Sequence, residues 1–369
     1  MRILYDGMIY ACQKAGGINR YFSQLIDRLP NDTTPVLTAT QYNTDQFPSH
    51  PNLEVYQWNY KKWPRPIRWL PRALKGVYFQ SLTERKNYDI QHPTYYESLL
   101  GKRGHRKHAP LVLTVHDMIH ERFSEMVDPA RKHAAIKRRA ILQADAIICV
   151  SEKTKSDLLE YYDLPDTPIS VVYHGCELQV PQDSQASPPV DRPYYLYVGA
   201  RHGYKNFDRL LQAMSVVCQN GSPIDLHITG APLSNMEIRK VNQLGLTEHI
   251  IPRGYLDDKA LADEYRFSLA VVYPSLYEGF GIPPLEAMCC GTAVIAANTS
   301  SIPEVVGDAG ILFDPYSVGE LSEILLEFPK NESQRSKLIE LGYQRQQQFS
   351  WDKMAKETIQ VYQQVLAAA

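Results

Sequence analysis

Short apolar runs alternate with amphipathic stretches along the whole chain, and this alternation predicts a repeating strand–helix architecture. The runs are rich in branched or aromatic residues and are bounded by glycine, proline or polar residues, as expected of strands buried in parallel sheets. The predicted strands are residues 2–5, 88–92, 111–115, the end of 140–150, 169–173, 194–198, 226–230, 250–256, 268–273 and 292–297. Alternating strands and helices of this kind predict an α/β fold.

Amphipathic helices are predicted where apolar side chains recur on one side of a helical turn. The first such helix follows the first strand and groups Ile18, Tyr21, Phe22, Leu25, Ile26 and Leu29. Two more helices are predicted over residues 318–328 and 332–348, beyond the last strand. The stretch from Trp351 to Val365 is again amphipathic and forms the last predicted helix.

The chain has 369 residues, which is long enough for two domains of ordinary size. Residues 181–193 are rich in proline, serine, glutamine and aspartate, a composition typical of a linker. We therefore expect a first domain over residues 1–180, a linker over 181–193 and a second domain over 194–349. The terminal stretch, residues 350–369, is set apart as the final helix.

One predicted strand–turn–helix unit, residues 268–291, has an unusually specific composition. Its apolar run ends at Pro274, and a tight turn follows with Gly279 and Gly281 on either side of Phe280. The next helix has two prolines in its first turn, where a missing N–H has no cost. The turn therefore lies at the carboxyl end of a strand and at a helix N-terminus. Phosphates and sugars bind at such places in open α/β sheets.

Two glutamates, Glu278 and Glu286, flank this turn with seven residues between them. A carboxylate accepts paired hydrogen bonds from neighbouring hydroxyls, so each glutamate could hold a sugar ring. The spacing alone is weak, because two glutamates at a fixed separation are common. The alternative interpretation is a surface turn with solvated glutamates.

Polar or glycine-rich positions also follow three other predicted strands. Gly16 and Gly17 precede the first helix, where their N–H groups could face a phosphate or a sugar, although plain loop glycines are the alternative. His116 comes directly after the strand 111–115. Arg201 and Lys205 follow the strand 194–198, where fixed cations could stabilise a nucleoside diphosphate gaining charge as it departs.

Composition and charge narrow the class of protein. No apolar run approaches the eighteen residues of a membrane-spanning helix, and the N-terminus turns polar too soon for a signal peptide. The six cysteines lie in no metal-binding spacing, so buried thiols in a reducing cytosol are expected. Residues 1–180 hold 24 Lys and Arg against 19 Asp and Glu, whereas the whole chain has a net charge of −2. This basic first half suggests an anionic partner, such as a phosphate-linked lipid or a membrane surface.

Residues 58–79 contain three of the four tryptophans, interleaved with six lysines and arginines. This composition suits a membrane interface that carries anionic lipid, and it also suits stacking against a sugar acceptor. A helix with inward aromatic and outward basic side chains explains it equally well. Nucleic-acid binding is not expected, because no RNA-reading motif accompanies the segment.

The combination of E-x7-E, the internal Gly-Phe-Gly, the preceding strand, the paired prolines and the following AVIAANTSSIPEVVGDAGILFDP resembles the retaining glycosyltransferases of family 4. The resemblance covers nearly the whole chain and is strongest over residues 194–315. It implies the GT-B fold, in which two Rossmann-like domains face one another across a cleft. The donor would bind mainly to the second domain and the acceptor mainly to the first, and the helix over 350–369 would cross back to the first domain.

The resemblance also implies roles for individual residues. Glu278 would hold sugar hydroxyls, and Glu286 would bind the ribose hydroxyls of the donor. The backbone N–H groups of Gly279, Phe280 and Gly281 would assist with the sugar and the phosphates.

Three side chains outside this turn match further family positions. Arg201 and Lys205 would stabilise the departing diphosphate, and His116 would orient the transferring sugar or the acceptor. The remaining donor-binding positions implied by the resemblance are Gly16, Gly17, Tyr255 and Leu256.

The activity that the resemblance implies is that of a retaining hexosyltransferase. It would move a sugar from a UDP- or GDP-sugar to an acceptor hydroxyl of a glycan or a lipid-linked saccharide, as in polysaccharide assembly, with mannosyl transfer favoured. The chain contains no D-x-D triplet. We therefore expect catalysis without a metal or a resident cofactor. The expected location is the cytoplasm, at most with peripheral contact at the inner face of the membrane. A nucleotide-sugar epimerase or a phosphorylase on the same fold, and a non-catalytic sugar-binding subunit, remain alternatives.

Overall fold

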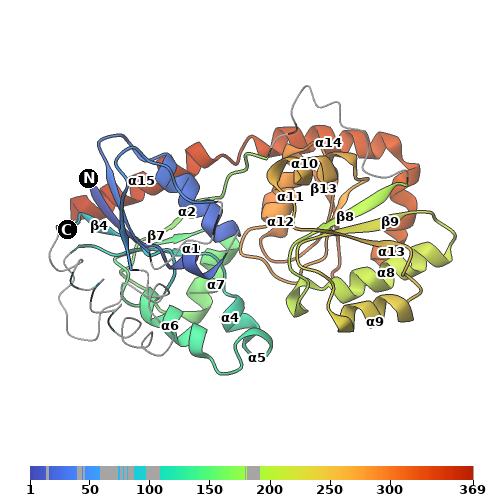
Figure 1. The fold of residues 1–369 in the computed structure, drawn as a ribbon, viewed down its shortest axis with the longest axis horizontal. Helices are drawn as coiled ribbons and strands as arrows, with labels where there is room; N and C mark the ends of the chain where they lie inside the picture. Colours follow the sequence, from blue (N-terminus) through green and yellow to red (C-terminus); the bar gives the residue numbers. More distant parts are fainter. Residues whose placement is uncertain are drawn as a thin grey trace. The chain divides into compact units, whose positions relative to one another are not determined.

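The computed structural model describes residues 1–13, 16–39, 44, 46–58, 74, 78, 81, 87–96, 109–178, 180 and 192–368. Its contacts divide the chain into two compact units (Figure 1). Unit 1 comprises Met1–His174 together with Trp351–Ala369, and unit 2 comprises Gly175–Ser350. Leu178 buries its side chain in the core of unit 2, so the chain has entered that unit before the predicted linker begins.

Unit 1 is built on a parallel sheet. Four strands pair in the order β3-β2-β1-β4 and three in the order β5-β6-β7, and a parallel bridge between Gln91 and Leu111 connects the two groups. The order reverses its direction between β1 and β4, as in doubly wound folds. The strands are β1 (Arg2–Asp6), β2 (Thr34–Ala39), β3 (Glu54–Gln57), β4 (Ile90–Gln91), β5 (Val112–Val115), β6 (Ala146–Cys149) and β7 (Ile169–Val171).

The helices of unit 1 include one from the far end of the sequence. Helix α15 packs against α2, and Figure 1 shows the two side by side. Trp351, Met354 and Tyr362 of α15 join the same core as Phe22 and Leu25 of α2. The helices are α1 (Met8–Cys12), α2 (Gly17–Asp27), α4 (Ile119–Arg122), α5 (Ser124–Val127), α6 (Lys132–Ile141), α7 (Glu152–Tyr161) and α15 (Trp351–Ala368).

Unit 2 has a six-stranded parallel sheet in the order β10-β9-β8-β11-β12-β13. The direction of winding reverses between β8 and β11, which are neighbours in the sheet. Every residue of β11 and β12 is buried, which explains why their sequences are continuous apolar runs. The strands are β8 (Tyr194–Val198), β9 (Asp225–Thr229), β10 (Ile250–Gly254), β11 (Val271–Tyr273), β12 (Val294–Ala297) and β13 (Gly310–Phe313).

Helices cover both faces of this second sheet. Figure 1 shows α10, α11 and α14 on one face and α8, α9 and α13 on the other. The helices are α8 (Phe207–Gln219), α9 (Asn235–Gln243), α10 (Asp258–Phe267), α11 (Ile282–Cys289), α12 (Ile302–Val306), α13 (Val318–Glu327) and α14 (Glu332–Gln346), with 3-10 turns η3 (Gly203–Lys205) and η4 (Phe328–Lys330). No helix within the described residues is long and apolar enough to cross a membrane.

The predicted α/β fold with parallel sheets is confirmed, and the main differences concern the strands β2, β3, β4 and β13. The strand predicted over 88–92 reduces to the two residues of β4. Strands β2, β3 and β13 were not predicted. In β2 the second residue is Pro35, and in β3 the burial alternates rather than running continuously. β3 lies at the edge of its sheet, where an unbroken apolar run is not required, whereas β2 pairs with a strand on each side.

A buried polar network connects α15 to the centre of the first sheet. His92 lies between two hydroxyls, with Nδ1 2.6 Å from the Tyr362 hydroxyl and Nε2 2.8 Å from Thr114 Oγ1. The Tyr362 hydroxyl is also 3.1 Å from that of Tyr5 in β1. Burial lowers the pKa of His92 from 6.5 to about 3, so the ring is neutral at neutral pH.

This network predicts a specific pH dependence of stability. Because the folded state lowers the pKa of His92 from 6.5 to about 3, the unfolded chain binds an extra proton between these values. Stability should therefore fall as the pH drops below 6.5, by up to about 1.4 kcal/mol per pH unit for each such histidine. His92→Gln should lower the free energy of unfolding at pH 7.5 but make its decrease toward pH 4.5 shallower.

Urea unfolding of the full chain, followed at several pH values, measures this slope. Replacing the exposed His202 by Gln is the control and should leave the slope unchanged. An unchanged slope in His92→Gln would show that the network does not hold this histidine neutral.

Candidate functional site

The site in unit 2 forms where the winding of its sheet reverses. Arg201 and Lys205 follow β8, and Glu278 follows β11, the neighbouring strand. Lys205 Nζ donates to Glu278 Oε1 at 2.6 Å, and both side chains are largely buried, with exposed fractions of 17% and 11%. The structure thus brings together two predicted residues that lie 73 positions apart in sequence. The carboxyl ends of strands at such a reversal are where open α/β sheets bind ligands.

Two tyrosine rings border the Lys205–Glu278 pair. Lys205 Nζ lies 5.2 Å from the centre of the Tyr204 ring and 6.0 Å from that of Tyr273. Burial raises the pKa of Tyr273 well above 10, and the neighbouring Glu278 carboxylate raises it further. The Tyr273 phenol is therefore neutral, and Lys205 and Glu278 carry the charges of this part of the site.

Arg201 is held close to the same strand end. Its guanidinium donates from Nε to Glu237 Oε1 at 2.6 Å, and only 5% of its side chain is exposed. The Nη1 atom is buried and has no hydrogen-bond partner among the residues that the structure describes. A buried cationic donor without an acceptor is costly, so this atom is suited to an incoming anionic oxygen.

The turn between β11 and α11 has the predicted geometry. Gly281 adopts φ +113° and caps α11, and the two prolines follow in the first turn of the helix. Only glycine adopts this backbone conformation readily. The glycine therefore lets the backbone turn sharply from the carboxyl end of β11 into α11, whose two prolines carry no N–H.

Two serines that sequence reasoning missed brace this turn. Ser301 Oγ approaches the carbonyl oxygens of Glu278 and Phe280 at 2.9 and 2.8 Å, and Ser300 Oγ donates to the Glu278 carbonyl at 2.7 Å. The Glu278 N–H is 3.3 Å from Ser300 Oγ. The serines belong to the quoted segment after β12, but nothing in their spacing indicated which turn they would contact.

The second glutamate of the pair is also buried in unit 2. Glu286 is 7% exposed and accepts a hydrogen bond from the Tyr265 hydroxyl at 2.8 Å. Burial, followed by the Glu286 carboxylate, raises the pKa of Tyr265 well above 10. Tyr265 was not predicted as a site residue, and its hydroxyl fixes the position of the Glu286 carboxylate.

The remaining predicted positions of unit 2 follow β10. Gly254 ends this strand with φ +72°, and Tyr255 after it is 80% exposed, which is unusual for a large aromatic side chain. Leu256 is half-buried beside it. An exposed ring at a strand end offers a flat surface to a nucleotide base.

In unit 1, the predicted glycines open helix α2. The Gly16 N–H points to Gln46 Oε1 at 3.4 Å, and Gly17 is the first helical residue. Gly16 has an extended backbone, φ 170°, which other residues also adopt. The backbone conformation therefore does not by itself require glycine at position 16, and the predicted donor contact of the pair stays a prediction.

His116 follows β5 and is packed among other rings. The Tyr21 ring meets it edge-on at 5.2 Å between centroids, and the His174 ring lies parallel to it at 6.1 Å. Burial lowers the pKa of His116 to about 3, with smaller effects from His92 and Lys137. Its buried Nε2 has no hydrogen-bond partner within the described ranges. A neutral imidazole of this kind can donate a hydrogen bond to a hydroxyl or accept one from it.

Two family models match consecutive parts of the chain. The model described as Glycosyltransferase Family 4 matches residues 15–180, and the model described as Glycosyl transferases group 1 matches residues 180–345. The chain is a family 4-like glycosyltransferase of the GT-B type.

Relatives and solved structures agree with this assignment. The O-antigen chain mannosyltransferase B of Escherichia coli is 32% identical over 230 residues, which cover 59% of this chain but only 60% of that protein. Sucrose-phosphate synthase from Thermosynechococcus elongatus has a TM-score of 0.80 at 20% identity, with both chains fully covered. Anabaena HepE, solved with UDP-glucose, has a TM-score of 0.73 at 17% identity, again with full coverage of both. The predicted GT-B class is confirmed by these structures.

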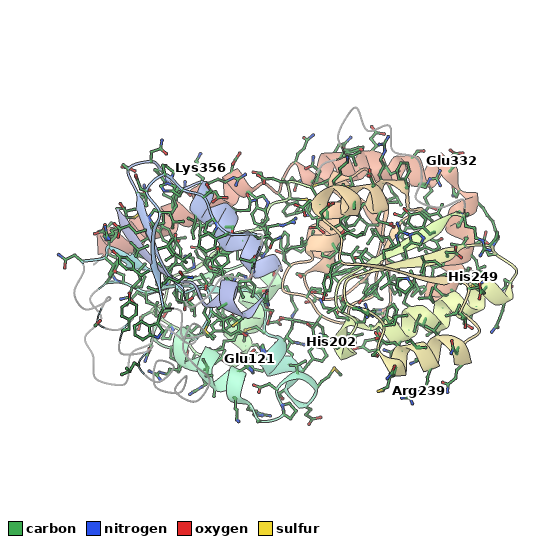
Figure 2. The ribbon with its side chains drawn as sticks, viewed as in Figure 1. Glu121, His202, Arg239, His249, Glu332 and Lys356 are labelled. Carbon is green, nitrogen blue, oxygen red and sulfur yellow. The ribbon has the colours of Figure 1, made fainter. Side chains whose placement is uncertain are left out.

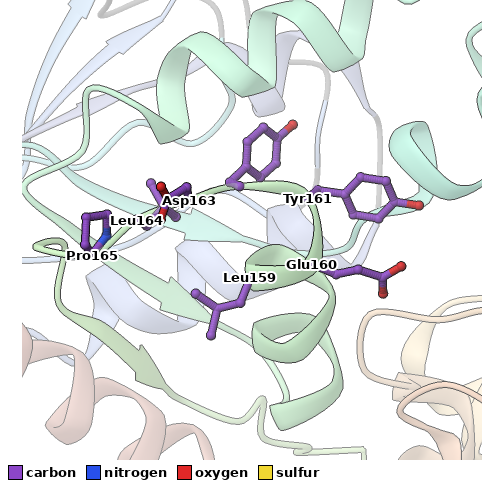
Figure 3. A pocket seen from close by; sticks show the side chains of 7 residues that line it. Leu159, Glu160, Tyr161, Asp163, Leu164 and Pro165 are labelled. Carbon is purple, nitrogen blue, oxygen red and sulfur yellow. The ribbon is translucent and has the colours of Figure 1, made fainter.

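Two further features of the glycosyltransferase involve other residues. The predicted segment 58–79 falls almost entirely outside the described residues, so its contact with a membrane or an acceptor stays a prediction. A pocket of about 370 Å³ lies at the end of α7 (Figure 3). It is lined by Leu159, Glu160, Tyr161, Tyr162, Asp163, Leu164 and Pro165, none of which is a predicted site residue.

Asn206 is a further residue that sequence reasoning missed. It adopts the left-handed conformation, φ +58°, directly after Lys205 (His202 in the same loop is labelled in Figure 2). Its Nδ2 donates to the carbonyl oxygens of Pro274, just after β11, and Pro315, just after β13, at 3.0 and 2.8 Å. Asparagine tolerates this conformation better than most residues, and its amide provides two donors. The residue therefore fixes the Lys205 loop to the ends of two other strands.

This arrangement predicts an unusual order of stability. Asn206→Gly keeps the backbone conformation but removes both hydrogen bonds and the one that Oδ1 accepts from Arg209, which should cost about 1–3 kcal/mol. Asn206→Ala loses the same bonds and adds the strain of a left-handed alanine, about 1 kcal/mol more. The alanine variant should therefore be the less stable one in chemical denaturation. At Asn220, where φ is −80°, the order of the two variants should reverse. Equal stability of the Gly and Ala variants at position 206 would contradict this account.

Proposed function

We propose that this protein transfers a hexose from a nucleotide-sugar to an acceptor hydroxyl with retention of the anomeric configuration. One observation carries the proposal: Lys205 and Glu278 meet at 2.6 Å at the strand reversal of unit 2. A nucleotide-sugar presents two kinds of group to such a pair, hydroxyls that a carboxylate accepts and phosphates that an ammonium binds. Glu278 would hold the sugar, and Lys205 would face the phosphates.

The main task of the site is to stabilise the negative charge that develops in the reaction. Breaking the bond between the anomeric carbon and the phosphate oxygen leaves a nucleoside diphosphate with additional negative charge. Lys205, Arg201 and the N–H groups of the glycine turn before α11 would stabilise this charge, and such preorganised groups contribute strongly to catalysis. No divalent ion is part of this proposal.

Retention follows if the acceptor oxygen attacks from the face that the diphosphate leaves. In the proposed step, the acceptor hydroxyl forms the new bond to the anomeric carbon and passes its proton to the departing phosphate oxygen. His116, neutral because burial lowers its pKa to about 3, would orient the transferring sugar or the acceptor. This mechanism rests on the resemblance to retaining family 4 enzymes.

The donor is proposed to be a UDP- or GDP-sugar and the acceptor a glycan or a lipid-linked saccharide. Tyr255 and Leu256 would border the base, Glu286 would bind the ribose, and Gly16 and Gly17 would lie beside the donor. The relative named as an O-antigen chain mannosyltransferase favours mannose and a polysaccharide acceptor. The peripheral membrane contact through residues 58–79 belongs to the same proposal, since lipid-linked acceptors lie at a membrane.

Replacing Lys205 by Ala tests the proposal most directly. The donor is first chosen by thermal shift against UDP-, GDP- and ADP-sugars, because a ligand that binds the folded state raises the melting temperature. Lys205→Ala should then lower kcat by about 10²- to 10³-fold, the usual effect of losing one preorganised group at developing charge. Donor affinity should change much less, since the charge is greatest in the transition state.

The exposed Lys259→Ala in the same unit is the control and should keep the wild-type rate. A Lys205→Ala enzyme with an unimpaired kcat would refute the proposed role of this lysine. Conversion of the nucleotide-sugar without any acceptor would identify an epimerase, and donor binding without transfer or hydrolysis would identify a sugar-binding subunit.

A further inference from the structure

The guanidinium of Arg201 has most of its donors occupied by protein. Nε donates to Glu237 Oε1 at 2.6 Å, and Nη2 is 2.8 and 2.9 Å from the carbonyl oxygens of Ala231 and Pro232. Nη1 has no partner in the described part of the chain, although it is buried. An Arg fork fixed on one edge in this way presents its remaining N–H groups in a single direction.

Glu237 is engaged on both oxygens. Oε1 accepts from Arg201, and Oε2 accepts from the Ser234 backbone N–H at 2.6 Å. The Ser234 side chain in turn lies 3.3 Å from the Glu237 N–H, which completes a capping box at the start of α9. One carboxylate therefore both caps a helix and holds the arginine. The rotamer of Arg201 depends on a carboxylate that is itself fixed by the backbone.

The loop that carries these acceptors is tied to the neighbouring strand ends. Gly230 follows β9 with φ +112° and donates its N–H to the Gly254 carbonyl at the end of β10, at 2.8 Å. A Cβ on Gly230 would lie 3.2 Å from the Gly199 carbonyl oxygen, just after β8. The loop thus approaches β8 closely, and it connects Arg201 to the strand end that precedes Tyr255.

We infer that Glu237 is a positioning residue that aims Nη1 of Arg201 at the diphosphate of the donor. The inference deepens the proposed function and rests on it. Glu237 does not contact the substrate in this arrangement. It removes the freedom of a long side chain before the ligand arrives, which lowers the entropic cost of binding. The ligand oxygen that Nη1 binds is that of a phosphate, because a guanidinium matches its charge and geometry.

The alternative is that Glu237 serves only to cap α9. The two roles can be separated, because Ser234→Ala weakens the capping box but leaves the Glu237 carboxylate on Arg201. Glu237→Gln removes the charge that holds the guanidinium and keeps the size of the side chain. Both variants should lose a similar amount of thermal stability, and only the second should affect the site.

Inhibition of the transfer reaction by UDP and uridine, or by GDP and guanosine, gives the decisive comparison in the full chain. Glu237→Gln should weaken inhibition by the diphosphate about tenfold, the weight of one charge-assisted hydrogen bond. Inhibition by the nucleoside, which has no phosphate, should stay unchanged. Ser234→Ala should leave both inhibition constants unchanged.

Equal losses for diphosphate and nucleoside in Glu237→Gln would show a general structural effect and overturn the inference. The Arg201→Ala variant separates this failure from failure of the proposed function. If Arg201→Ala weakens diphosphate inhibition and Glu237→Gln does not, Arg201 binds the diphosphate but Glu237 is not its positioning residue. If Arg201→Ala has no effect either, the assignment of Arg201 itself is wrong.

Discussion

The ion pair between Lys205 and Glu278 is the interaction around which the site in unit 2 is organised. Two largely buried charges of opposite sign are stable next to each other only because each neutralises the other. A nucleotide-sugar offers each charge a new partner, hydroxyls for the carboxylate and phosphate for the ammonium. The pair thus holds both groups in place in the unliganded protein. The reversal of strand order between β8 and β11 is what brings the two residues together.

The loops around this pair are fixed by polar contacts rather than by their own apolar cores. Ser301 holds the turn after β11, Asn206 ties the loop after β8 to two other strand ends, and Glu237 holds Arg201. Catalytic preorganisation requires that charged groups do not reorient as charge develops. A parallel sheet supplies the rigid base, and these side chains extend the rigidity into the loops. In unit 1, the network around His92 ties the terminal helix α15 to the first sheet.

Much of this arrangement could be predicted from the sequence because its parts are local. The apolar run, the glycine turn and the paired prolines of residues 268–291 lie next to each other, and their geometry follows from backbone preferences. The polar contacts that fix the loops could not be predicted, because the role of a serine or an asparagine depends on a partner far along the chain. Tyr265 on Glu286 and Glu237 on Arg201 are separated by 21 and 36 positions. The short length of β4 and the edge strand β3 were not predicted for a related reason, since their pairing rather than their composition defines them.

The central claim is that cations and amide dipoles of unit 2 meet the charge of a departing diphosphate. A crystal structure of the protein with its nucleoside diphosphate product tests this claim most directly. The account predicts phosphate oxygens within hydrogen-bond distance of Lys205 Nζ and Arg201 Nη1, at the N-terminus of α11. A diphosphate that lies away from both side chains would contradict it.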